Sequence, residues 1–259
     1  MRILITNDDG IYAAGLKALH RELSEMADCV VVAPETEQSA VGHAITLSRP
    51  LMVRKALRKG HVWGYAVTGT PADCVKIAIR ELSSDPFDLV VSGINLGANA
   101  GINVIYSGTV SAAAEGTLMG IPSLAVSLDT RSEKADFSFA ARFAGRLAQS
   151  AATNGLARGI TLNVNVPALP QGEIRGVAVT RQGSQPWKET FEKRVSPREE
   201  TYYWLSGRAS GPGEEHEDSD IAALRKGMIS ITPIHYDLTK HDVLDALGNS
   251  ITDSLLADL

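Results

Sequence analysis

The sequence predicts an α/β fold, a Rossmann-like and mainly parallel sheet with helices on both faces. Two observations lead to this prediction. Short apolar runs typical of buried strands alternate with helical patterns as far as Val166, and this order is characteristic of a parallel sheet covered on both sides. The chain of 259 residues is also long enough to bury a sizeable core.

The expected elements follow from local patterns of apolar residues. In Tyr12–Met26, for example, Leu16, Leu19 and Leu23 recur at helical spacing. In chain order, the expected strands are Arg2–Thr6, Cys29–Ala33, Leu89–Ser92, Ile121–Leu128 and Ile160–Val166. The expected helices are Tyr12–Met26, Asp73–Leu82, Thr109–Met119 and Phe137–Ala152.

The pattern changes after Pro167. The segment Gln182–Pro212 is polar with scattered aromatic residues, and we expect long hairpins there that project from the core, with a strand at Thr201–Leu205. Aromatic side chains on such an arm more often pack against a partner subunit than stack on a ligand. The expected elements after it are a helix at Asp220–Gly227, a strand at Met228–Thr232 that ends at Pro233, and a terminal helix at Thr239–Leu247.

These patterns divide the chain into two parts of one domain. Residues 1–180 are expected to form the Rossmann-like catalytic core, and residues 181–259 a C-terminal hairpin arm with the terminal helix. An exposed arm of this kind favours an oligomer over a monomer.

Composition and charge are those of an ordinary globular protein, with 44% hydrophobic and 21% charged residues and a net charge of -5. The acidic balance argues against a nucleic-acid polymer as the main partner. No apolar stretch is long enough to cross a bilayer, and the N-terminus shows no signal-peptide pattern. Cys29 and Cys74 lie in apolar stretches and are expected to be reduced core residues. We therefore expect a cytoplasmic protein with no membrane contact.

Two adjacent carboxylates, Asp8 and Asp9, follow the first expected strand. In open parallel sheets, ligands bind beyond the carboxyl ends of the strands. Adjacent carboxylates repel each other and need a cation or hydrogen-bond donors, and their oxygens suit magnesium, manganese or calcium. The alternative is a turn in which Asp8 or Asp9 caps the next helix. The pair alone does not decide between these readings.

The second expected strand leads into a polar loop, Pro34–Gly42, followed by His43. This loop would face the same crevice as the two aspartates. Ser39 is a candidate hydroxyl ligand there. His43 is a candidate acid or phosphate contact, although a lone histidine in a loop is more often simply exposed to solvent.

Residues 88–116 have the arrangement that a phosphate group prefers. A buried strand ends in a Gly/Asn-rich loop, which leads into a helix at Ser107, Gly108 and Thr109. Unpaired backbone N–H groups, hydroxyls and the positive end of the helix dipole meet there, and Gly108 lacks a Cβ that would obstruct an oxyanion. The alternative, that Ser107 or Thr109 only caps the helix, leaves the Gly/Asn loop unexplained. At Gly69–Asp73, capping by Thr70 is the better interpretation.

Taken together, these segments resemble the SurE survival-protein family of 5'/3'-nucleotidases. The resemblance follows the family order and covers nearly the whole chain. The matching segments are Ile5–Gly10, Gly69–Val75, Val91–Gly97, Tyr106–Val110, Asn163–Pro167, Thr180–Gly183, Ser230–Pro233 and Asp237–Thr239.

The resemblance implies a set of site residues. Asp8, Asp9, Ser39 and Asn95 match the ligands of one divalent metal ion per subunit, magnesium, manganese or a similar ion. Ser107, Gly108 and Thr109 match the phosphate-binding loop, with Asn99 beside it. Ala40–His43 differs from the more common version of this loop in the family, which leaves the role of His43 open. The role of His235 is open as well. The resemblance also implies a C-terminal arm exchanged within a homodimer, sometimes assembled into a homotetramer.

The implied reaction is hydrolysis of nucleoside 5'- and 3'-monophosphates, with short polyphosphate as a further candidate substrate. Metal-bound Asp8 and Asp9 would be the catalytic carboxylates, and whether water or Asp8 attacks phosphorus stays open. A dinucleotide-dependent enzyme is the alternative enzyme class, but a Gly-x-Gly-x-x-Gly turn does not follow the first strand. A nucleotide-binding regulator without turnover is the alternative outside enzymes. The base, the metal and the choice between dimer and tetramer are not determined.

Overall fold

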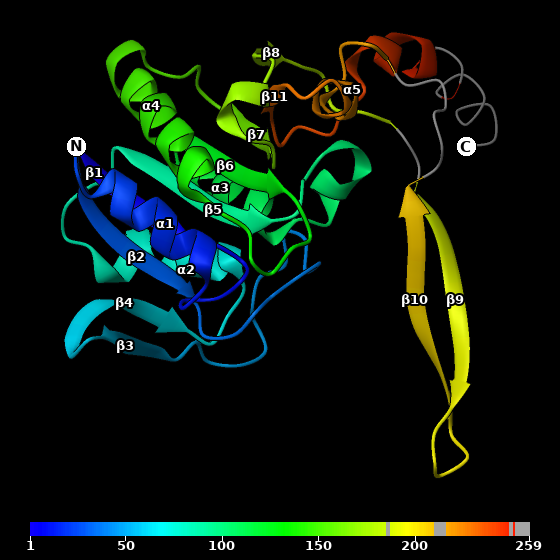
Figure 1. Cartoon of the computed structure of the whole chain (residues 1–259), viewed down its shortest axis with the longest axis horizontal. Coiled ribbons are helices and arrows are strands. Elements are labelled where there is room, and N and C mark those ends of the chain that lie inside the picture. The colour runs from blue at the N-terminus through cyan, green and yellow to red at the C-terminus, as the bar shows by residue number, and fades with distance from the viewer. Residues whose placement is uncertain (185–186, 210–215, 249–250, 252–259) are drawn as a thin grey trace.

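The computed structural model describes residues 1–184, 187–209, 216–248 and 251, and its central feature is one nine-stranded sheet (Figure 1). The strand order is β3-β4-β2-β1-β5-β6-β7-β11-β8. The six strands from β4 to β7 run parallel to one another. Their order is that of the Rossmann fold, and it reverses between β1 and β5. The predicted fold class is confirmed.

The strands carry the apolar residues expected of a buried sheet. β1 (Arg2–Thr6) is buried beyond its first residue, and β5 (Leu89–Leu96) is buried over its first six residues. The other strands of this sheet are β2 (Asp28–Pro34), β3 (Val53–Arg58), β4 (His61–Val67), β6 (Ser123–Asp129), β7 (Thr161–Pro167), β8 (Val177–Val179) and β11 (Ile229–Ile234).

Helices cover both faces of the sheet, as predicted. α1 (Ala14–Leu23) and α4 (Ser138–Asn154) pack together on one face (Figure 1). α2 (Pro71–Ile77) and α3 (Gly108–Leu118) pack together on the other. Thr70 caps α2 through a reciprocal pair of hydrogen bonds with Asp73, as the sequence suggested. Alternate side chains of β1 point to opposite faces, so Ile3 joins the α1 side and Leu4 the α2 side.

Some elements differ from the sequence prediction. β3 and β4 were not predicted: Ala56 is the one buried residue of β3, and Gly64 interrupts the apolar run of β4. β11 passes through Pro233 to Ile234, where we expected the strand to end. Proline is tolerated there because β8 pairs only with Ile229–Ile231, so β11 is an edge strand at this point. The expected terminal helix begins as a turn of 3-10 helix at His241–Val243 and continues as α-helix over residues 244–248.

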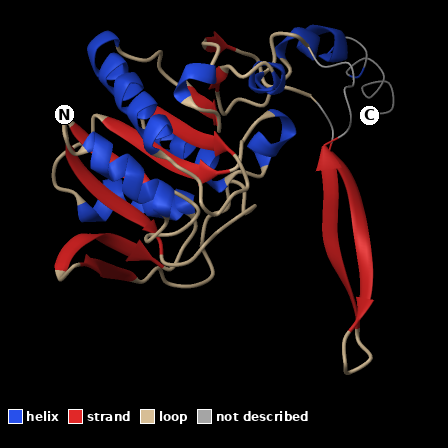
Figure 2. Ribbon diagram, in the orientation of Figure 1, coloured by secondary structure: helices blue, strands red, loops and turns tan. Residues whose placement is uncertain are grey.

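A two-stranded antiparallel hairpin projects away from the sheet (Figure 2). β9 (Trp187–Val195) pairs with β10 (Thr201–Ala209) along their whole length. Exposed aromatic side chains on it include Phe191, Tyr203 and Trp204. The hairpin confirms the predicted arm; part of the segment expected to carry it, around Pro212, lies outside the described residues. After the arm, α5 (Asp220–Arg225) packs on β11 at the sheet.

Two further features bear on the sequence predictions. Cys29 and Cys74 are both free thiols, and burial raises the pKa of each above its ordinary value. In the described part of the chain, no helix has the length and apolar character that a membrane span requires.

Candidate active site

Asp8 and Asp9 follow β1, beside the position where the strand order reverses. Asp8 is 5% exposed and Asp9 is half-buried. Helix α1 begins several residues later at Ala14, after Ala13, and no side chain caps it. Neither aspartate is therefore the cap of this helix, and the capping interpretation of the pair is wrong. Their carboxylates lie at the carboxyl edge of the sheet, where open α/β folds bind ligands.

Asp8 lies against the first turn of α3. The hydroxyl of Thr109 donates a hydrogen bond to Asp8 Oδ1, and the backbone N–H of Thr109 also bonds this carboxylate. A Cβ on Gly108 would lie 2.8 Å from Asp8 Cβ and 3.0 Å from its Oδ2. Burial raises the pKa of Asp8 while the bond from Thr109 opposes that rise. The carboxylate thus occupies the positive end of this helix.

Asp9 lies against the end of β5, where its carboxylate bonds the backbone N–H of Leu96. Because Leu96 directly follows Asn95 in the chain, this contact brings Asp9 close to Asn95. Burial, together with the negative charges of Asp8 and Glu37, raises the pKa of Asp9 to about 7. The two neighbouring charges that raise this pKa are both acidic, and such crowding of carboxylates favours a cation beside them.

The polar loop after β2 lies over the same point, as the sequence suggested. The backbone N–H of Gln38 donates to the carbonyl of Asp8 at 2.8 Å. The exposed hydroxyl of Ser39 donates to Glu37 Oε1 at 2.5 Å. The sequence interpretation did not single out Glu37, although it lies in the loop named there. Its charge adds a third carboxylate to the neighbourhood of Asp8 and Asp9.

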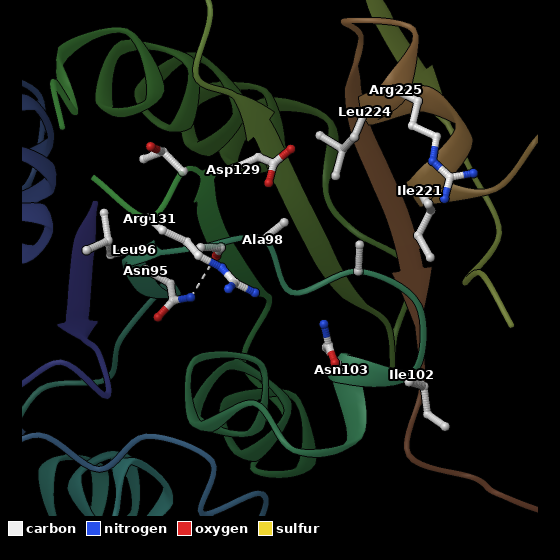
Figure 3. A pocket seen from close by; sticks show the side chains of 13 residues that line it. Asn95, Leu96, Ala98, Ile102, Asn103, Asp129, Arg131, Ile221, Leu224 and Arg225 are labelled. Carbon is white, nitrogen blue, oxygen red and sulfur yellow. Dashed lines mark hydrogen bonds between the residues drawn. The ribbon is translucent and has the colours of Figure 1, made fainter. Parts of the chain in front are cut away.

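The four predicted metal ligands come from the loops after β1 and β2 and from the end of β5. In Asn95 the side-chain nitrogen donates to the carbonyl of Gly97 at 2.8 Å, which orients the amide and leaves Oδ1 available (Figure 3). In the described residues, no three His, Cys, Asp or Glu side chains form a metal-binding group. The predicted set contains only two carboxylates, and its other oxygens come from serine and asparagine. Crowded acidic oxygens and the buried, unbonded Asn7 Oδ1 beside them fit a hard divalent cation.

The predicted phosphate turn lies at the start of α3. Ser107 is the N-cap of α3, and its hydroxyl accepts from the backbone N–H of Val110 at 3.1 Å. The Thr109 hydroxyl is directed to Asp8. In the described part of the chain, the backbone N–H of Gly108 donates to no other group. This N–H is available to an oxyanion at the turn, as is the O–H of Ser107, which the bond from Val110 leaves unused.

Asn99 is buried in a network of its own. Its side-chain nitrogen donates to Ser127 Oγ at 2.9 Å, and its backbone N–H donates to Asn165 Oδ1 at 2.8 Å. Asn163 in turn donates to the carbonyl of Asn99 at 2.7 Å. This network explains two asparagines of the Asn163–Pro167 segment: they hold the loop after β5 against β7. A direct phosphate contact by Asn99 stays a prediction.

The two histidines left open by the sequence lie in different places. His43 Nε2 is 2.9 Å from Glu115 Oε2, so His43 joins the loop after β2 to the middle of α3. His235 is exposed and follows β11. Because β11 is antiparallel to β7, Ile234 pairs with Thr161 at the amino end of β7. His235 therefore lies at the sheet edge opposite to Asp8 and Asp9.

Fold and site together define an α/β protein with an acidic cluster, formed by Asp8, Asp9 and Glu37, at the position where the strand order of the sheet reverses. The N-terminus of helix α3 lies beside this cluster. A sequence profile described as Survival protein SurE matches residues 3–189. The chain belongs to the SurE family, as the resemblance in the sequence indicated.

Named relatives and a solved structure agree with this assignment. The chain is 60% identical to a 5'-nucleotidase SurE of Syntrophus aciditrophicus, over 95% of this chain and 92% of the relative. It is 55% identical to the protein of the same name from Syntrophobacter fumaroxidans, over 96% and 98%. A crystal structure of the SurE protein from Aquifex aeolicus matches with a TM-score of 0.83 at 38% identity, over 96% of this chain and 99% of that one.

Proposed function

We propose that this chain is a divalent-metal-dependent phosphomonoesterase that hydrolyses nucleoside monophosphates to nucleoside and phosphate. The observation that carries the proposal is the contact between Asp8 and the first turn of α3, which brings candidate metal ligands beside a candidate phosphate site. Relatives that are named 5'-nucleotidase support nucleoside 5'-monophosphates as substrates. Action on 3'-monophosphates and on short polyphosphate is part of the same proposal.

The acidic cluster would hold one divalent ion. Asp8 and Asp9 supply carboxylate oxygens, and Ser39 Oγ and Asn95 Oδ1 complete the oxygen set. When bound, a divalent ion supplies Lewis-acid polarisation of a phosphoryl oxygen and lowers the pKa of a water. Thr109 fixes the orientation of Asp8, and the backbone N–H of Leu96 fixes that of Asp9. Both carboxylates are thereby held in place before substrate arrives.

The turn of Ser107, Gly108 and Thr109 would bind the phosphate, with Asn99 bordering it. The N–H of Gly108 points from the helix N-terminus without a Cβ in the way. Its contribution grows as negative charge moves onto the phosphoryl oxygens in the transition state. Because two donors of Thr109 already hold Asp8, we propose that water, rather than Asp8, attacks phosphorus. No phospho-aspartate would then be trapped at Asp8 during turnover.

The proposal also covers the cellular location of the protein and the assembly of its subunits. We propose a cytoplasmic homodimer or homotetramer in which the β9–β10 hairpin contacts another subunit. The exposed aromatic side chains of the hairpin support this proposal.

Release of inorganic phosphate tests the function directly. A panel of 5'- and 3'-nucleoside monophosphates is incubated with manganese, with magnesium or with EDTA. We expect release that needs metal, prefers nucleotides to simple sugar phosphates and is lost in Asp9→Asn. Glu25→Gln, which changes an exposed carboxylate after α1, near the amino end of β2 and so at the sheet edge opposite to Asp8 and Asp9, is the matched control. Phosphate release in EDTA, or full activity of Asp9→Asn, would contradict the proposal.

A further inference from the structure

A pocket of about 710 Å³ begins at Asn95 and extends away from the acidic cluster (Figure 3). Its volume lies within the range of sites that bind small organic ligands. Asn95 is thus shared between the candidate metal site and this pocket. A ligand that reaches Asn95 from the pocket therefore also reaches the candidate metal site.

The two walls of the pocket differ in chemistry. The wall at the ends of β5 and β6 is polar and includes Asn95, Asp129 and Arg131. The opposite wall carries the aliphatic side chains of Ile221 and Leu224 on α5, with Ile102 beside them (Figure 3). One polar and one apolar wall suit a ligand that combines hydroxyl groups with a flat ring.

The apolar wall is fixed to the rest of the site by a buried carboxylate. Asp220, which is fully buried at the start of α5, accepts from the backbone N–H of Gly101 at 2.9 Å and from that of Gly183 at 2.9 Å. A Cβ on Gly101 would lie 2.6 Å from Ile221 Cδ1, so the loop and the helix are closely packed. Helix α5 is therefore held against the segment that links β5 to the phosphate turn.

We propose that this pocket binds the nucleoside part of the substrate, with the base against Ile221 and Leu224 and the ribose hydroxyls toward Asp129 and Arg131. This inference rests on the proposed function, since it places the leaving group of that reaction. Helix α5 thus takes part in choosing the substrate.

A chain of further phosphate groups fits the pocket less well. The aliphatic side chains of Ile221, Leu224 and Ile102 offer no donor to phosphate oxygens. Asn103 and Arg225 are the polar side chains on this side of the pocket, and on the other side the carboxylate of Asp129 would repel a phosphate group. Arg131 and Arg225 each already have an interaction within the structure. The observed lining therefore favours a nucleoside.

The test fills the pocket from either wall with Leu224→Trp and Thr130→Trp. Lys226→Trp adds the same ring just beyond α5, at an exposed position outside the pocket, and serves as the matched control. We measure kcat and KM for adenosine and uridine 5'-monophosphates and for glycerol 2-phosphate, which lacks a base. Circular dichroism selects the variants that are folded.

We expect KM for the nucleotides to rise about tenfold or more in both pocket variants, while kcat/KM for glycerol 2-phosphate and the behaviour of Lys226→Trp stay near wild type. The inference is overturned if a folded pocket variant loses activity on both substrate types equally, keeps full activity on nucleotides, or loses activity on short polyphosphate alone.

Binding of free nucleosides separates this inference from the proposed function. Adenosine and uridine are added to the wild type without metal, and their binding is followed by ligand-observed NMR. If the wild type releases no phosphate from any substrate, the proposed function fails. Nucleoside binding that is lost in Leu224→Trp and Thr130→Trp would still support the pocket. An absence of nucleoside binding to the wild type would overturn it.

Discussion

Gly108 lies so close to Asp8 that a methyl group on its Cα would stand 2.8 Å from Asp8 Cβ. Real side chains do not approach this closely, so the position requires glycine for packing reasons. The contact joins the loop after β1 to the first turn of α3. Any change at Gly108 therefore displaces Asp8, Pro71 or the turn itself.

The first prediction concerns Gly108→Ala. We expect phosphate release to fall about 100-fold, because a shift of about 1 Å in a reacting group has consequences of this size. Gly172→Ala is the matched control, since Gly172 has no atom within 4 Å of a new Cβ. The measurement is kcat for a nucleoside monophosphate, with the melting temperature recorded for both variants. An active Gly108→Ala enzyme would show that Asp8 need not hold its observed position.

The hydroxyl of Thr109 gives the second prediction. Thr109→Val keeps the shape of the side chain but removes the donor to Asp8 Oδ1. Since that bond opposes the rise in the pKa of Asp8, its loss favours the protonated form. We expect the manganese concentration for half-maximal activity to rise about tenfold, or about 1.4 kcal/mol of binding free energy.

Thr109→Ser is the control for this experiment, because serine keeps the hydroxyl and loses only a methyl group. It should retain most of the metal affinity. If Thr109→Val and the wild type need the same manganese concentration, the bond to Asp8 does not influence metal binding.

The third prediction concerns the stability of the metal-free protein. The pKa of Asp9 is raised to about 7 by burial and by the charges of Asp8 and Glu37. A raised carboxyl pKa in the folded state means that, as the pH rises, the unfolded state releases this proton at a lower pH than the folded state does. The resulting contribution to the free energy of unfolding is present below about pH 4 and is lost as the pH rises to about 7.

Asp9→Asn has no carboxyl group to ionise at this position, so it avoids this fall in the free energy of unfolding. In EDTA, we expect the variant to melt at a higher temperature than the wild type at about pH 8, and at a similar temperature at about pH 4. Manganese should then stabilise the wild type more than the variant, because metal binds the folded state. Melting curves with Glu25→Gln as the control check this. A lower melting temperature for Asp9→Asn in EDTA at the higher pH would contradict the predicted repulsion.

The sequence was sufficient for five of the six parallel strands, because each of them is rich in apolar residues. It was not sufficient for β3, where Ala56 is the one buried residue, or for β4, where Gly64 interrupts the apolar run. It also placed the end of β11 at Pro233, because the exposed edge that accommodates this proline depends on how far β8 extends.

The site was predictable to a similar extent. Strand ends and the Gly/Asn loop located Asp8, Asp9 and the turn at Gly108. The charge of Glu37 and the contact between His43 and Glu115 depend on how separate loops fold together. A sequence pattern does not fix such contacts between segments far apart in the chain.

The last prediction compares two lysine–carboxylate pairs that differ in burial. Lys76 Nζ lies 2.6 Å from Glu115, whose side chain is 4% exposed, and Lys240 Nζ lies 2.7 Å from the exposed Asp242. Burial alone would raise the pKa of Glu115, but hydrogen bonds from His43 and Lys76 hold it below its ordinary value. The carboxylate of Glu115 therefore depends on these partners, whereas water solvates that of Asp242.

Lys76→Met should consequently lower the free energy of unfolding by about 1–3 kcal/mol, the cost of leaving a buried polar group with fewer partners. Lys240→Met should change it by less than about 0.5 kcal/mol, as for most exposed ion pairs. Urea unfolding of both variants at neutral pH measures the difference. Equal effects would mean that solvent reaches Glu115 despite its burial. In that case His43 would not anchor the loop after β2, and Lys76 would not anchor helix α2, to the helix that carries the candidate phosphate turn.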